Sequence, residues 1–281
     1  ELGVDLINVT GSGLNGRISK EDVKNYVKSS MSLPSDQRVI GDKPEFEEFD
    51  FSKFGSVNEQ SLTRIQKQVA KNMARNWKAI PHVTQHDDID VTDLETFRKE
   101  MEPTLGKLSA VAFIVKAVTI ALKDFPQLNA SLKNDGETLV LKEYIHIGLA
   151  VNVKDGLLVP VIKNADQKGL RELSYEISRL ADGARDGALS FQDFSGSSFT
   201  VSSLGKLGGT GFSPIINHPE VAILGVGRSS DRLMMSEGGV SNRKILPLSL
   251  SYDHRVINGV YGGEFMARIS DVLTDVRKLS I

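Results

Sequence analysis

His254 and Asn258 are the residues whose types and spacing best suit catalysis. The stretch SYDHRVINGVYGGEF (251–265) places the histidine four residues before the asparagine, between an apolar strand pattern and a helix pattern. A histidine at the end of an element could act as a general base. Such a base is usually oriented by a carboxylate, whereas an amide stands here. The same two residues could also be a locally satisfied histidine and a helix cap, and the residues alone leave both open.

The serines that end the strand pattern of SSFTVSSLGKLGGTG (197–211) are the second candidate. Strand alternation puts Ser202 on one face with Thr200 and Leu204, and Ser203 on the other. A hydroxyl in this place could donate a hydrogen bond to an oxyanion, or could simply close the strand. The glycines that follow do not have the spacing of a phosphate-binding loop, and no Lys-Ser or Lys-Thr pair follows them.

Metal and thiol chemistry find little support in the sequence. His82 and His86 are four residues apart, but their segment alternates like a strand and supplies no third ligand, so we predict no metal site. The chain contains no Cys, which excludes disulfides, thiolate nucleophiles and cysteine-based metal sites. This composition fits a reducing compartment, and we expect the cytoplasm.

The composition is that of a soluble globular protein. The 281 residues are 40% hydrophobic and 25% charged, with a net charge of −2. We therefore expect no nucleic-acid partner, and no membrane partner because apolar runs stay short of the roughly 18–20 residues of a membrane span. The length allows one domain of roughly 200–250 residues or two smaller ones. The chain starts without Met and inside a pattern, so we expect it to be a piece of a longer protein.

Three zones divide the chain. Residues 1–28 form a small module with a glycine-marked loop and a helix from a Ser19 cap to about Lys28. Residues 29–48 are rich in Ser, Pro and charge and have no apolar period, which predicts a flexible linker. Residues 49–281 mix helix and strand patterns in one α/β (α+β) domain.

Within 49–281 the patterns predict an ordered series of elements. Helices are expected over 62–80, from a Thr92 cap, over a buried 108–125, over 170–187 and from Gly259 onward. Strands are expected over 82–91, 144–153, 156–162, 197–205, 221–227 and 244–254. The hairpin turn near Asp155–Gly156 favours a mixed or largely antiparallel sheet over a doubly wound parallel one.

Residues 49–281 resemble the catalytic domain of dihydrolipoamide acyltransferases, the E2 cores of 2-oxo acid dehydrogenase complexes. The motifs that carry the resemblance are DFSKFG (50–55), GLLVPVIKNAD (156–166), SSFTVSSLGKLGGTGFSPIINHPEVAILGVG (197–227) and LSYDHRVING (250–259). The resemblance implies a mixed-sheet, trimer-forming domain of the coenzyme A-dependent, chloramphenicol acetyltransferase-like type. Residues 1–28 are similar to the later part of a peripheral-subunit-binding domain.

The resemblance also implies roles for individual residues. His254 would be the base of the family's His-x-x-x-Asp-Gly signature, and Ser202 would donate to the oxyanion. Asn258 stands where the family more commonly has Asp, which puts in doubt any pair between that position and Arg64. Arg64 would contact coenzyme A or anchor the structure. The active site would lie in a channel between subunits of the trimer.

The implied activity is acetyl transfer between dihydrolipoamide and coenzyme A, in the core of a pyruvate dehydrogenase complex. The lipoyl group would sit on a lipoyl domain upstream. Partners would be two further copies in a homotrimer that builds a larger core, lipoyl domains, and the E1 and E3 subunits through the binding domain. Alternatives are a succinyl or branched acyl chain, a scaffold core without activity, and acylation of a small alcohol or amine. A hydrolase is disfavoured because no G-x-S-x-G nucleophile elbow is present.

Overall fold

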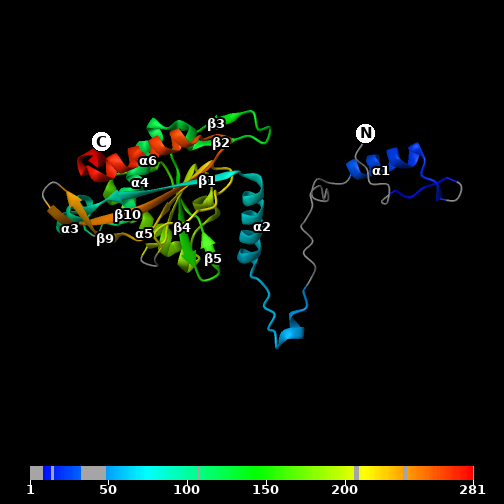
Figure 1. The fold of residues 1–281 in the computed structure, drawn as a ribbon, viewed down its shortest axis with the longest axis horizontal. Helices are drawn as coiled ribbons and strands as arrows, with labels where there is room; N and C mark the ends of the chain where they lie inside the picture. Colours follow the sequence, from blue (N-terminus) through cyan, green and yellow to red (C-terminus); the bar gives the residue numbers. More distant parts are fainter. Residues whose placement is uncertain are drawn as a thin grey trace. The chain divides into compact units, whose positions relative to one another are not determined.

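The computed structural model of this protein describes residues 9–13, 16–32, 49–106, 108–205, 209–236 and 239–280 (Figure 1). The chain divides into two units, residues 1–60 and 61–281. The first unit contains helix α1 (Lys20–Ser32) and the short 3-10 helix η4 (Phe51–Phe54). Most of the linker expected over 29–48 lies outside the described residues, and its first positions belong to α1.

The Ser19 cap predicted for α1 is present. The backbone N–H of Asp22 donates to the Ser19 hydroxyl (3.2 Å), while the Ser19 backbone N–H donates to the Asp22 carboxylate (2.7 Å). Ser12 donates to the same carboxylate from the glycine-marked loop, and these bonds hold the pKa of Asp22 below its ordinary range. Asp22 therefore ties the loop to the helix. The helix continues four residues beyond Lys28, the expected end.

The second unit is a sheet with helices. Its α-helices are α2 (Arg64–Ala79), α3 (Thr92–Leu105), α4 (Ala110–Asp124), α5 (Leu170–Asp186) and α6 (Gly259–Thr274). Its 3-10 helices are η5 (Pro126–Asn129), η6 (Ala165–Gln167), η7 (Phe191–Phe194) and η9 (Val276–Ser280). Its strands are β1 (His82–Asp90), β2 (Ala130–Leu132), β3 (Leu139–Leu141), β4 (Ile147–Val153), β5 (Gly156–Leu158), β6 (Val161–Ile162), β7 (Phe199–Ser203), β8 (Ala222–Val226), β9 (Ser230–Ser236) and β10 (Gly239–Asp253).

The large sheet is mixed, as predicted. Its strand order is β1-β10-β8-β7-β4-β5, with β6 paired to β4 and β9 paired to β10. Strand β7 runs parallel to β4 and β8, and the other pairs are antiparallel. Strands β2 and β3 form a separate hairpin. The sequence patterns did not predict β2, β3 or β9.

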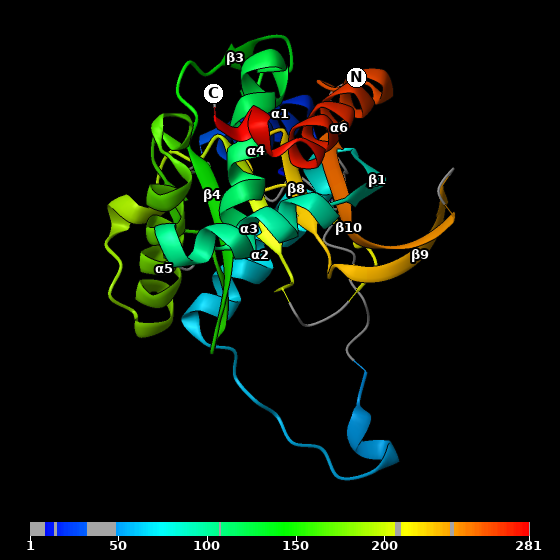
Figure 2. The ribbon, with the colours of Figure 1, turned by 90° about the vertical axis from the view of Figure 1, so that its left-hand side faces the viewer.

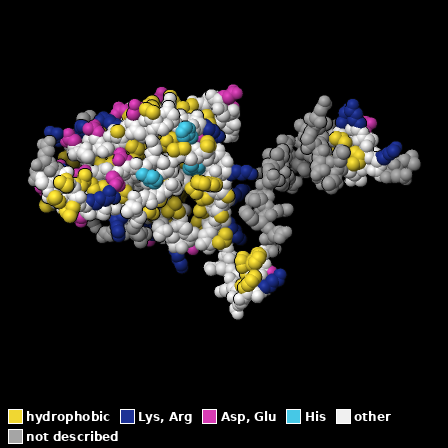
Figure 3. Space-filling view, viewed as in Figure 1, with side chains coloured by type: hydrophobic (Ala, Val, Ile, Leu, Met, Phe, Trp, Pro, Cys, Tyr) yellow, Lys and Arg dark blue, Asp and Glu magenta, His cyan; other side chains and the backbone are white. Residues whose placement is uncertain are grey.

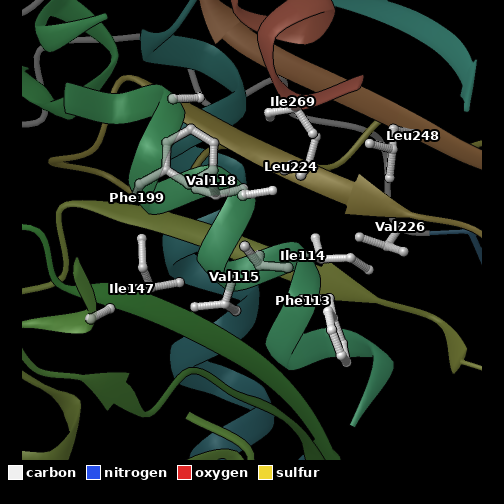
Figure 4. Packing of buried hydrophobic residues seen from close by; sticks show 14 of the residues in the cluster. Phe113, Ile114, Val115, Val118, Ile147, Phe199, Leu224, Val226, Leu248 and Ile269 are labelled. Carbon is white, nitrogen blue, oxygen red and sulfur yellow. The ribbon is translucent and has the colours of Figure 1, made fainter. Parts of the chain in front are cut away.

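One face of the sheet carries the hydrophobic core. Helices α3, α4 and α6 lie in front of β4, β8 and β10 in Figure 2. Figure 4 shows buried side chains of α4, such as Phe113 and Val118, packed against buried side chains of the sheet and of α6. Phe199 and Leu224 come from the strands β7 and β8, and Ile269 comes from α6. The apolar character of 108–125 therefore reflects packing of α4 onto this face. Among the described residues, no helix combines the length and apolarity needed to cross a bilayer.

Local capping explains where the helices begin. Thr63 and Gln66 form a reciprocal capping box at the start of α2, and Ser109 caps α4 through the N–H of Val111. Thr92 is not the cap that the sequence predicted. It is the first residue of α3, and its hydroxyl donates to Asp90 (2.6 Å). The carboxylate of Asp90 competes for that hydroxyl, which leaves the cap position to Val91.

Candidate active site

The other face of the sheet is lined by polar side chains near its centre. Cross-strand pairing places Ser202, Gly225, Ser249 and His86 in one row on β7, β8, β10 and β1. The Nδ1 atom of His86 and the Oγ atom of Ser249 are 2.8 Å apart. Figure 3 shows His side chains (cyan) on the visible face of this unit. This polar face, opposite the core, carries the candidate residue Ser202.

Ser202 is half-buried near the carboxyl end of β7. It is paired with Ala150 on one side and Gly225 on the other. The ring of Phe212 covers Gly225 so closely that a Cβ there would lie 2.8 Å from the ring. A side chain at position 225 would therefore displace the Phe212 ring from its place beside Ser202. The alternation predicted for this strand is confirmed, because Thr200 and Ser202 share the polar face.

His254 follows β10 directly and its residue is exposed. Its backbone N–H donates to the carbonyl of Pro81 (3.0 Å), which ties the turn to the segment between α2 and β1. Its ring lies 6.0 Å from the ring of Tyr252, with the two planes tilted by 37°. The backbone is therefore fixed while the imidazole faces solvent.

Asp253 and Arg255 flank His254 and were not singled out from the sequence. Asp253 is buried, and its carboxylate forms a bidentate pair with the Arg255 guanidinium, with Nη2 and Oδ2 2.6 Å apart. These bonds raise the pKa of Arg255. The signal that could have found the pair is the Asp-x-Arg spacing around the candidate base.

Asn258 caps α6, as its alternative interpretation required. Its side-chain oxygen accepts a hydrogen bond from the N–H of Tyr261 (2.9 Å). Four residues into the helix, Gly262 lets α6 approach the sheet. A Cβ at Gly262 would lie 2.7 Å from Gln85 and 2.9 Å from Tyr252. The close packing predicted for the Gly262–Gly263 pair is therefore present at its first glycine.

Ser202 and His254 are not brought together within one chain. The register places Ser202 level with Ser249 on β10, five residues before His254. Five strand residues span about 16 Å, and the two strand spacings between β7 and β10 add about 10 Å sideways. The two side chains are thus roughly 19 Å apart, far beyond hydrogen-bond reach.

Arg64 lies near the β4–β5 hairpin, at the end of the sheet away from His254. Arg64 is exposed and is the first residue of α2. The next residue, Ile65, lies close to β5, because a Cβ atom added to Gly156 would be 4.0 Å from the Ile65 Cγ2 atom. Helix α2 then runs about 22 Å to the end that leads to Pro81 and the His254 turn. An arginine that the sequence analysis missed, Arg75, lies in the later half of α2.

Arg75 and Arg255 both lie close to His218. Burial first, then the charges of these two arginines, lower the pKa of His218. His218, Arg255 and Lys133 line a pocket of about 160 Å³ beside the His254 turn, together with Glu220 and Asp253. Both arginines and carboxyls therefore lie near the His254 turn.

Glu220 is a buried carboxyl that the sequence analysis also missed. Burial raises its pKa from 4.5 to about 7, although Thr200, Ser197, Asn217 and the Lys142 ammonium lie near it. Neither of its oxygens has a hydrogen bond of normal geometry. The carboxyl therefore keeps its proton well above the ordinary range of a glutamate.

The two histidines of β1 serve other purposes than joint metal binding. Four residues along one strand separate His82 and His86 by about 13 Å, too far to share an ion. The Nδ1 atom of His82 lies 2.8 Å from the carbonyl of Ile80, and its Nε2 accepts from the N–H of Ile216 (3.0 Å). Within the described residues, no group of three or more His, Asp or Glu side chains is placed to hold a metal ion.

Similar proteins are known for both parts of the chain. Residues 54–281 match the family described as 2-oxoacid dehydrogenases acyltransferase (catalytic domain), and residues 1–24 match the e3 binding domain. This chain is 47% identical to the dihydrolipoyllysine-residue acetyltransferase component of the pyruvate dehydrogenase complex of Cupriavidus necator, and 45% identical to that of Haemophilus influenzae. Both alignments cover 99% of this chain, and 53% and 52% of those proteins. The chain thus spans about half the length of these curated relatives.

Solved structures agree with this assignment. The dihydrolipoamide acetyltransferase of Azotobacter vinelandii is 44% identical, with a TM-score of 0.82, and the match covers 85% of this chain and 100% of that one. A structure of the cubic core of the pyruvate dehydrogenase multienzyme complex gives the same identity, coverage and TM-score. The chain belongs to the family of 2-oxoacid dehydrogenase acyltransferases.

Proposed function

We propose that this chain transfers an acetyl group between dihydrolipoamide and coenzyme A, as the E2 core of a pyruvate dehydrogenase complex. One observation carries the proposal. The Azotobacter vinelandii enzyme was studied for the role of a serine, a histidine and an asparagine in its catalytic mechanism, which are separated by 52 and four positions. Ser202, His254 and Asn258 have the same types in the same order at the same separations.

In the proposed reaction His254 takes the proton of the attacking thiol. The thiolate attacks the thioester carbonyl, and the Ser202 hydroxyl donates a hydrogen bond to the oxyanion that forms. His254 then returns the proton to the leaving thiol. The base contributes about 10²–10⁴ in rate and the oxyanion donor about 10²–10³. No acyl-enzyme is required, which suits a chain without Cys.

Asn258 is sufficient at its position because the proton comes from a thiol. In serine hydrolases, where the base must act on a weakly acidic alcohol, replacing the orienting Asp by Asn favours the wrong histidine tautomer and costs about 10⁴ in rate. A thiol has an ordinary pKa of about 8.5 and an imidazole one of about 6.5, a mismatch of roughly 2.7 kcal/mol. The base needs little help, and Asn258 acts by capping α6 behind the turn that carries His254.

The separation of Ser202 and His254 supports an active site between two copies. A distance of roughly 19 Å within one chain prevents the two groups from acting on the same thioester. In a ring of three copies, His254 of the partner subunit would face Ser202 and Arg64 of its neighbour. Arg64 lies at the Ser202 end, where we expect it to contact coenzyme A or anchor the structure.

Three further expectations rest on the same assignment. The lipoyl group is expected on a lipoyl domain of the longer protein. Residues 1–24 match the e3 binding domain, so we propose E1 and E3 as partners. The bacterial relatives and the absence of Cys favour the cytoplasm.

Intersubunit complementation tests the proposed site. His254→Ala and Ser202→Ala should each lower kcat for acetyl transfer from acetyl-coenzyme A to dihydrolipoamide by at least about 100-fold. Assembled together in equal amounts, the two variants should recover activity, because about a quarter of the interfaces then combine an intact histidine with an intact serine. A fully active His254→Ala variant would reject the mechanism, and a mixture without recovery would reject the shared site.

Acyl-chain specificity needs a separate measurement. We expect acetyl-coenzyme A to exceed succinyl- and isobutyryl-coenzyme A in kcat/KM with the wild-type chain. A preference for either of the larger donors would still support acyl transfer between thiols, but it would assign the core to a different 2-oxo acid dehydrogenase complex.

A further inference from the structure

The turn that carries His254 is closed by its two neighbours. The Asp253 carboxylate accepts from the backbone N–H of Arg255 (3.0 Å) and from the Nε and Nη2 atoms of its guanidinium (3.0 and 2.6 Å). The carbonyl of Asp253 accepts from the N–H groups of Val256 (3.0 Å) and Ile257 (2.9 Å). We call the side-chain pair of Asp253 and Arg255 the His254 clamp.

Backbone hydrogen bonds join Asp253 of the clamp to the sheet. The backbone N–H of Asp253 donates to the carbonyl of Val221 (2.8 Å), just before β8, and Asp253 pairs with His82 in the last position of the β1–β10 ladder. The Asp253 side chain is 3% exposed, whereas that of Arg255 is 47% exposed. The carboxylate is thus fixed inside the protein, and the guanidinium closes over it from the solvent side.

A bidentate arginine restricts the turn more than a single cation would. The planar guanidinium fixes two parallel bonds to the carboxylate, while a lysine ammonium is a point charge on a flexible stem. The clamp spans the residue that carries the base, so loosening it removes one of the constraints on the His254 turn and leaves the backbone bonds to hold it alone. A reacting group displaced by about 1 Å can lose a factor of about 10² in rate.

We propose that Asp253 and Arg255 are positioning residues that act through His254, with Arg255 holding the Asp253 carboxylate so that the imidazole stays aligned with the thiol. This inference rests on the proposed function, in which His254 is the base. Neither residue needs to touch a substrate, so the clamp should affect the chemical step and leave substrate binding almost unchanged.

Arg255→Lys tests the clamp with the charge retained. Its matched control is Arg277→Lys, which loosens an Asp-x-Arg pair of the same geometry formed with Asp275, the residue just before η9. We expect Arg255→Lys to lower kcat about 10- to 100-fold per assembled site, with KM for both substrates within about twofold. Arg277→Lys should leave kcat at the wild-type value. Circular dichroism and size-exclusion chromatography give the fraction that is folded and assembled.

A double-mutant cycle separates positioning from general destabilisation. If Arg255 acts only through His254, then Arg255→Lys should not lower the residual rate of His254→Ala any further. The same 10- to 100-fold loss in both backgrounds, or a wild-type kcat for Arg255→Lys, would overturn the clamp while leaving the proposed function intact. A fully active His254→Ala would instead reject the proposed function itself. Asp253→Asn, which keeps the shape of the side chain, should repeat the kcat loss if Arg255→Lys does not fold.

Discussion

Two Asp-x-Arg turns of this chain make the same bonds in different surroundings. In the His254 clamp the Asp253 side chain is 3% exposed, whereas in the Asp275–Arg277 pair the two side chains are 25% and 87% exposed. Both aspartates accept from the backbone N–H two residues on and from the guanidinium of that residue. Bonds from Arg277 lower the pKa of Asp275 to about 2. The comparison shows that burial, not bond geometry, separates a fixed turn from an ordinary surface pair.

Replacing the arginine of each turn should produce the largest difference in stability between the two turns. Arg255→Met leaves the Asp253 carboxylate buried and without its charged partner, which we expect to lower the free energy of unfolding by about 3–4 kcal/mol. Arg277→Met leaves Asp275 in water and should not change it measurably. Urea titrations of both variants measure the difference, and equal midpoints would show that the two turns are energetically alike.

Glu220 extends the comparison to a buried carboxyl without an arginine. Because burial raises its pKa from 4.5 to about 7, its contribution to stability is present below pH 4.5 and is lost as the pH rises to about 7. Glu220→Gln imitates the protonated form, so it should equal the wild type near pH 4.5 and exceed it by about 3 kcal/mol at pH 8. Urea titrations at the two pH values provide the measurement. A parallel pH dependence of both proteins would contradict the assigned pKa.

Substitutions of Asn258 test the helix cap that follows the His254 turn. Asn258→Ala removes the cap of α6 and should cost about 1 kcal/mol in unfolding free energy, whereas Asn258→Asp should stay within a few tenths because the two caps are nearly equal. Asn258→Asp should also change kcat by less than about tenfold, since a thiol needs little priming of the base. A large gain in kcat with Asp would show that the amide limits the base.

A high salt concentration should also distinguish the two turns, and we expect this effect to be the smallest. At 1 M NaCl the Debye length is about 3 Å, so charges in water are screened while buried ones are affected much less. The pKa of Asp275 should therefore move toward its ordinary value in an NMR titration at high salt. The kcat of the wild type, which depends on the His254 clamp, should stay constant under the same conditions. A kcat that falls in step with Asp275 would mean that the clamp is open to solvent.

Local patterns predicted much of the fold because they depend on nearby residues. The four-residue apolar period gave α2, the Asp155–Gly156 turn gave the β4–β5 hairpin, and Asn258 was correctly placed as a possible cap. The hairpins β2–β3 and β9–β10 were not predicted because β2 and β3 are only three residues long and most described side chains of β9 are exposed without apolar alternation. Thr92 was misplaced because its hydroxyl is taken by Asp90.

The candidate site was predicted as residue types and not as an arrangement. Ser202, His254 and Asn258 were chosen from motifs, and their roles stay predictions. The roughly 19 Å between the serine and the histidine follows from the pairing of β7, β8 and β10, which are far apart in the sequence. Arg75 was missed because only its closeness to His218 makes it notable, and Glu220 was missed because only its burial does.

The sequence by itself determined the chemistry that is available: a histidine base, a serine hydroxyl, an amide cap, and Asp-x-Arg spacings that include 253–255 and 275–277. Only the tertiary structure decided which Asp-x-Arg turn is buried and that the base and hydroxyl of one chain lie apart. Capping and turn formation are set by a few adjacent residues. Burial and cross-strand register are instead sums over distant contacts, which no local pattern contains.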